Sequence, residues 1–96
     1  MTQYILLIHG NAKTEPTSLD WDQFFAAAGR SGLFEGGSAI GRREVLGDIS
    51  SAQSSDHLVG FMRFDAVDKQ TLLDLLQSHP VVLHGGSVEL CEMPES

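Results

Sequence analysis

The fold of this chain is decided by residues 57–64, which read His57-Leu58-Val59-Gly60-Phe61-Met62-Arg63-Phe64. In an extended backbone successive side chains point to opposite faces, so Met62 and Phe64 fall on one face while Val59 and Phe61 fall on the other. A strand that is apolar on both faces is typical of the middle of a sheet. The apolar run at residues 4–8, which ends at a Gly-Asn turn signal, predicts a second strand of the same kind.

A first helix is expected to begin at Thr17. Thr17 and Asp20 have the spacing of a capping box, in which each side chain bonds the backbone N–H of the other. Apolar residues then recur at helical spacing, namely Trp21, Phe24, Phe25 and Ala28. The glycine-containing stretch 29–32 is expected to end this helix.

A second helix is expected to begin after Asp68, a favourable N-cap residue. Val67 and Leu72 have the spacing of a hydrophobic staple across that cap. Helical spacing continues as far as His79, where a protonated imidazole would favour the negative end of the helix. Pro80 is expected to stop the helix.

Two weaker strands are expected at residues 34–45 and 87–93, because both carry charges and follow or contain glycines, as edge strands do. Residues 47–56 are rich in serine and are expected to form a mobile loop between two antiparallel strands.

The expected order is βαββαβ, which predicts an α+β, ferredoxin-like domain spanning residues 1–96. Right-handed crossovers place both helices on one face of a four-stranded antiparallel sheet in spatial order 4-1-3-2. The other face of the two central strands is also apolar, and the chain has no further element to cover it. We therefore expect a homodimer in which two sheets face each other.

Composition excludes several classes of partner. The chain has 6 Lys and Arg against 13 Asp and Glu, a formal charge of −7, so we expect no nucleic-acid binding. Its longest apolar run is too short for a signal peptide or a membrane span, and no membrane partner is expected. Cys91 is the single cysteine, which favours a cytoplasmic location. We expect no metal, because the four histidines lack ligand spacing, and no cofactor.

Three segments of the sequence resemble the YCII-related family, including its DGPF-like branch. They are residues 4–10, residues 57–66 and residues 79–90, the last of which contains a His-Pro pair followed by Gly-Gly-Ser-Val-Glu. The resemblance implies a dimeric α+β barrel of ferredoxin-like subunits and does not imply a particular reaction. Some members have an acid/base pair with a histidine in the first helix, but residues 21–29 contain none, and the DGPF tetrapeptide is also absent.

Candidate ligand contacts are His9, Arg42, Arg43 and His84. His9 ends the first strand, where an imidazole can act as acid or base, or can simply bond to backbone. Arg42 and Arg43 would point to opposite faces of a strand, so that one could hold an anion; alternatively they protect an edge and pair with Glu44 or Asp48. His84 precedes a Gly-Gly loop.

Two other residues of the sequence are expected to have no functional role. His57 should lie at the opposite end of the sheet from His9 if the first and third strands run parallel. Cys91 lacks a neighbour in sequence that would lower its pKa and is expected to be structural.

Three functions remain open from the sequence. The first is binding of a small anionic or aromatic molecule in a cleft near the dimer interface, with His9 and an arginine as contacts. The second is an acid/base isomerase or lyase with His9 as the catalytic base. The third is an interaction module whose dimer is itself the function.

Overall fold

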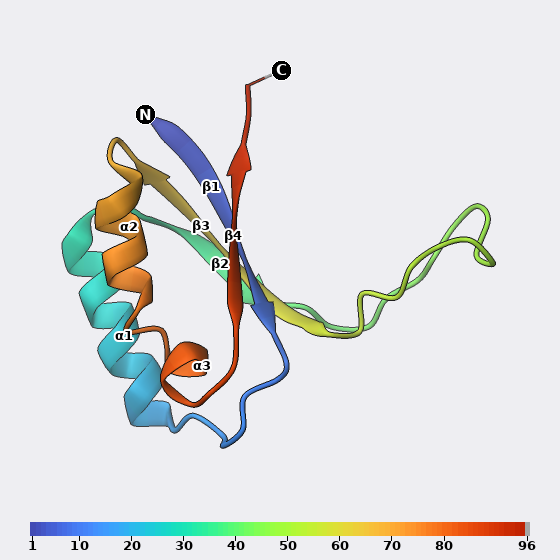
Figure 1. Ribbon diagram of the computed structural model, residues 1–96, viewed down its shortest axis with the longest axis horizontal. Helices are drawn as coiled ribbons and strands as arrows, with labels where there is room; N and C mark the ends of the chain where they lie inside the picture. The colour runs from blue at the N-terminus through green and yellow to red at the C-terminus, as the bar shows by residue number, and fades with distance from the viewer. Residues whose placement is uncertain (96) are drawn as a thin grey trace.

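The computed structural model describes residues 1–95 and has an antiparallel sheet with helices on one face only (Figure 1). The strands are β1 (Thr2–His9), β2 (Phe34–Ala39), β3 (Leu58–Ala66) and β4 (Val88–Met93), and the helices are α1 (Ser18–Ser31), α2 (Lys69–Leu76) and α3 (Pro80–Leu83). The strand order β2-β3-β1-β4 is the predicted one. The fold is therefore α+β with an open four-stranded sheet, compatible with a ferredoxin-like fold. Among residues 1–95, no helix has both the length and the apolar character needed to cross a membrane.

The core lies between the helices and one face of β1 and β3. Leu6 pairs with Met62 and Tyr4 pairs with Phe64, and all four side chains are buried. The helices contribute Phe24 and Ala28 from α1 and Leu72 and Leu76 from α2. The prediction that both central strands are apolar on the two faces is confirmed, because Leu7 and Phe61 pair on the side away from the helices and are only half-buried.

The sheet is antiparallel throughout, so the expectation that the first and third strands run parallel is wrong. Residue 2 of β1 pairs with residue 66 of β3, and His9 pairs with Leu58. The reason is topological: β2 returns into β3 through a hairpin connection, which reverses the chain and leaves β3 antiparallel to both neighbours. His57 consequently lies beside His9 instead of at the far end of the sheet; the two imidazole centroids are 5.2 Å apart.

The start of α1 is the predicted one. Thr17 is the N-cap: its hydroxyl accepts from the Asp20 N–H at 3.2 Å, and the Asp20 carboxylate accepts from the Thr17 N–H at 2.8 Å. Gly32 ends the helix with φ +73°, a left-handed conformation that glycine adopts without strain. An N-cap of this type stabilises a protein by about 1 kcal/mol.

The second helical region differs from the prediction. Asp68 is the N-cap of α2 as expected, but Val67 is 84% exposed, so the staple with buried Leu72 does not form. The helix ends at Leu76, and Pro80 starts α3 instead of only ending α2. Proline is favoured in the first turn of a helix because the N–H that it lacks has no partner there.

Strand β2 is shorter than predicted and ends at Ala39. Beyond the hydrogen bond from Ile40 N to Val59 O at 2.9 Å, the chain leaves the sheet. Residues 41–56, which we call the arm, run out from the sheet and back without forming a helix or a strand (Figure 1). The loop predicted at 47–56 belongs to this arm. Arg42 and Arg43 also lie in it, so the prediction that they sit on a strand is wrong.

Candidate functional site

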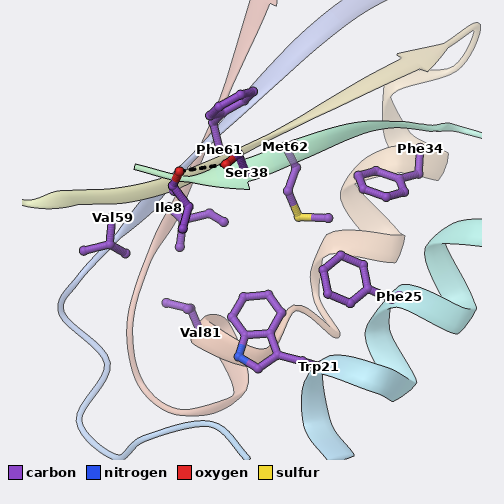
Figure 2. Close-up of a pocket in the computed structure, with 12 residues that line it drawn as sticks. Ile8, Trp21, Phe25, Phe34, Ser38, Val59, Phe61, Met62 and Val81 are labelled. Carbon is purple, nitrogen blue, oxygen red and sulfur yellow. Dashed lines mark hydrogen bonds between the residues drawn. The ribbon is translucent and has the colours of Figure 1, made fainter. Parts of the chain in front are cut away.

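A cavity of about 410 Å³ lies between α1 and the β2-β3 side of the sheet (Figure 2). Every side chain that lines it is uncharged. The lining residues are Ile8, Trp21, Phe25, Phe34, Gly37, Ser38, Ala39, Val59, Gly60, Phe61, Met62 and Val81. Such a volume and apolar character fall within the range of small-molecule sites, which are roughly 300–1,000 Å³.

Aromatic rings from α1 and β2 form one wall of the cavity. The Trp21 and Phe25 rings are stacked, with centroids 5.8 Å apart and planes inclined by 29°, and Phe34 lies 6.0 Å from Phe25. Figure 2 shows Met62 pointing toward these rings, whereas Phe61 points to the opposite side of its strand. Phe61 therefore contributes backbone to the cavity, and its ring belongs to the sheet face without helices.

Glycines keep the sheet wall of the cavity flat. Gly60 is on the same face of β3 as Met62, and a Cβ there would come within 3.2 Å of Ser38 O and 3.4 Å of Ile8 Cδ1. At Gly37 a Cβ would overlap the Phe61 carbonyl, so only glycine permits this close approach of β2 to β3. The neighbouring Gly36 has φ +111°, a conformation that favours glycine, so both residues of the Gly36-Gly37 pair in β2 are accounted for.

His79 lies directly behind the aromatic wall. It is fully buried, and its Nδ1 accepts the Val81 N–H at 3.1 Å, which makes it the N-cap of α3. Its ring meets Trp21 edge-on at 5.2 Å and Phe24 at 4.8 Å. Burial lowers the pKa of His79 to about 4, so the prediction that it is a protonated residue at the end of a helix is wrong.

The second ring nitrogen of His79, Nε2, has no hydrogen-bond partner. Because Nδ1 is the acceptor, the neutral ring carries its proton on Nε2. His79 thus holds Trp21 against α3 by packing and by its cap.

A separate group of polar side chains lies at the end of β1. His9 Nε2 is 2.9 Å from Glu89 Oε1, and the His57 ring is adjacent. Glu89 stands opposite Leu7, on the face that carries no helices. This arrangement supplies the carboxylate that can orient an imidazole for acid/base work. Among residues 1–95, no three His, Cys, Asp or Glu side chains gather closely enough to hold a metal ion.

The two candidate arginines have different surroundings. Arg43 Nη2 donates to the Leu58 carbonyl, and Nη1 is 3.6 Å from Asp56 Oδ1. Its expected pairing with Glu44 or Asp48 is therefore wrong, because Arg43 bridges the two ends of the arm instead. Arg42 is exposed. Leu58 is also the β3 residue that pairs with His9, so Arg43 and His9 are both neighbours of Leu58.

His84 contacts helix α1 and the loop after β1 through its two ring nitrogens. Nε2 donates to Asp20 Oδ2 at 2.8 Å, and the Thr14 hydroxyl is 2.8 Å from Nδ1. Hydrogen bonds from Thr17, followed by a smaller contribution from His84, lower the pKa of Asp20. A carboxylate, an imidazole and a hydroxyl in this order can activate a nucleophile. Here the adjoining bond from Lys13 N to His84 O at 2.9 Å indicates that the contacts fasten the loop after β1 to α3.

The candidate residues are thus distributed over three places. His9 and Arg43 lie near one end of the sheet, His84 lies at the α1–α3 junction, and none of the candidates His9, Arg42, Arg43 and His84 lines the cavity. The cavity residues were visible in the sequence only as core positions: the helical spacing of Trp21 and Phe25 and the glycines at 37 and 60 were the available signals. No model of a known protein family and no curated protein matches the chain.

Proposed function

We propose that this protein binds a small, neutral, aromatic molecule in the cavity between α1 and the β2-β3 edge. The observation that carries the proposal is the cavity's wall of Trp21, Phe25 and Phe34 facing a flat, glycine-backed sheet. A planar ring fits between such surfaces and gains about 0.5–1.5 kcal/mol per aromatic contact beyond its burial. The uncharged lining favours an aromatic ligand over an anionic one.

Paired aromatic compounds test this proposal. We expect 2-naphthol to bind at micromolar concentration by isothermal titration calorimetry at pH 7, and 2-naphthoate to bind about tenfold more weakly, because no cation among the lining residues compensates a buried carboxylate. Phe25→Ala removes one of the three rings of the aromatic wall and should weaken naphthol binding about tenfold.

Leu19→Ala is the matched control, since Leu19 is an exposed apolar residue on the same helix and does not line the cavity. Its naphthol affinity should equal that of the wild type. Absence of binding by wild type at millimolar naphthol, or equal losses in the two variants, would contradict the proposal.

A second candidate function is acid/base catalysis at His9, favoured by the 2.9 Å contact with Glu89. A general base typically contributes about 10²–10⁴-fold to a rate. If His9 is the base of an isomerase or lyase, the protein should catalyse the entry of deuterium from D₂O into aromatic keto or hydroxy acids. His9→Gln should then reduce the rate of this exchange by about 10²–10⁴-fold. Exchange that continues unchanged in His9→Gln would assign it to another group.

We further propose that the chain is a YCII-related protein and a homodimer. The family is supported by the three resembling segments and by the strand order β2-β3-β1-β4. The dimer is supported by the sheet face opposite the helices, which we call the free face. It carries half-buried apolar side chains on its central and edge strands, namely Ile5, Leu7, Phe61, Cys91 and Met93.

A further inference from the structure

The arm is the part of the molecule that the fold itself does not explain. It projects well beyond the sheet (Figure 1), and the Cα radius of gyration is 14.5 Å, compared with about 12.5 Å for a compact chain of this length. Its tip carries apolar side chains in water: Leu46 is 90% exposed and Ile49 is 68% exposed, with Val45 beside them. Burying one such side chain is worth about 1.5–3 kcal/mol.

The arm is held in shape at both ends. At its base, Arg43 bonds the Leu58 carbonyl and lies near Asp56, so the outgoing and returning segments are joined. At its tip, the Asp48 carboxylate accepts from the Ser50 N–H at 3.1 Å and from the hydroxyls of Ser50 and Ser51 at 2.7 Å each. These bonds fix the turn at residues 48–51, which contains Ile49 and follows Leu46 by one residue. A surface that is already shaped loses less conformational entropy when it binds.

We infer that the arm is a clasp that packs on a second copy of this chain and extends the contact made by the free face. This inference rests on the homodimer proposed above. The arm connects β2 to β3, and Phe61 of β3 belongs to the free face. The arm therefore leaves the sheet at the border of that interface. Figure 1 shows the helices beside one face of the sheet and the arm extending toward the opposite side, where no other helix or strand of residues 1–95 lies.

Symmetry favours a second copy as the partner, and the charge of the arm opposes it only weakly. The chain carries a formal charge of −7, but the arm contains two arginines against three acidic residues, so it can approach another copy with little repulsion. In a two-fold dimer each contact occurs twice. Two arms therefore contribute to one association.

Analytical ultracentrifugation over a concentration series tests the clasp. We expect the wild type to be dimeric at micromolar concentration and the double variant Leu46→Asp/Ile49→Asp to have a dimer dissociation constant raised at least tenfold. Both residues are exposed in the monomer, so the fold should be unaffected, as circular dichroism can verify. Val67→Asp is the matched control: Val67 is equally exposed but lies in the β3–α2 turn, and its dissociation constant should not change.

Leu7→Gln, on the free face, separates the two proposals. If Leu7→Gln weakens the dimer and the arm variant does not, the clasp is overturned and the homodimer proposal stands. The reverse result supports the arm and overturns the sheet-to-sheet contact. A wild type that stays monomeric at the highest concentration overturns both. Amide hydrogen exchange at residues 44–50 should slow as the wild-type concentration rises, and exchange that is independent of concentration would also overturn the clasp.

Discussion

Acidification from pH 6.5 to pH 4 is expected to lower the free energy of unfolding by roughly 3 kcal/mol, through His79 alone. In the folded protein burial lowers the pKa of His79 to about 4, whereas an unfolded histidine has its usual pKa of about 6.5. Between these values the unfolded chain binds a proton that the folded chain does not. The contribution of His79 to stability is therefore present above pH 6.5, falls as the pH decreases, and levels off only below pH 4, where the folded protein also binds the proton.

Urea unfolding at a series of pH values measures this loss, and His79→Asn is the matched variant. Asparagine is a favourable N-cap residue and can accept the Val81 N–H, but it does not titrate. The variant is expected to be less stable at neutral pH because it leaves space beside Trp21 and Phe24, and its stability should be nearly flat from pH 6.5 to pH 4.

An equally steep loss in His79→Asn would assign the pH dependence to other groups. NMR titration of the folded wild type gives an independent measurement, because the ring protons of His79 should shift only near pH 4. Asp20 affects stability in a different pH range. The Thr17 hydrogen bonds lower the pKa of Asp20, so the stability that it contributes is present above about pH 4 and is lost only at still lower pH.

The same histidine illustrates where inference from sequence stops. Its spacing from Leu72 and Leu76 is helical, and nothing local distinguishes the last turn of one helix from the cap of the next. The distinction depends on Trp21 and Phe24, which come from a helix more than fifty residues earlier and bury the ring. Elements whose signals are local were predictable: the capping box at Thr17 and the two strands with apolar residues on both faces.

The candidate site was less predictable for the same reason. His9 was a sensible candidate from its place at a strand end, but its partner Glu89 is eighty residues away and becomes adjacent only through the β1–β4 register. The cavity is also made by pairing between distant segments, since Gly60 forms part of its sheet wall only after β2 and β3 pair. Sequence patterns identified these residues as apolar or polar without showing which space they enclose.

Phe64→Ala is expected to cost about 3–5 kcal/mol, a large part of the roughly 5–15 kcal/mol that stabilises a typical domain. Phe64 is fully buried at the centre of the core, and its ring centroid lies 5.5 Å from that of Phe34. The loss combines the transfer of the ring to water with the cavity left among neighbours that can relax only partly. Phe64→Leu, which keeps most of the volume, should cost less and remain folded.

Phe25→Ala provides the contrast, because Phe25 is 45% exposed at the cavity and water already reaches its ring. Its truncation should change the free energy of unfolding by only about 1 kcal/mol while weakening naphthol binding. Urea midpoints for the three variants, measured beside calorimetric titrations, separate a residue that holds the fold together from one that contacts a ligand. If Phe25→Ala destabilises the protein as much as Phe64→Ala does, the aromatic wall is part of the core, and its rings are held in place by packing that a ligand would have to displace.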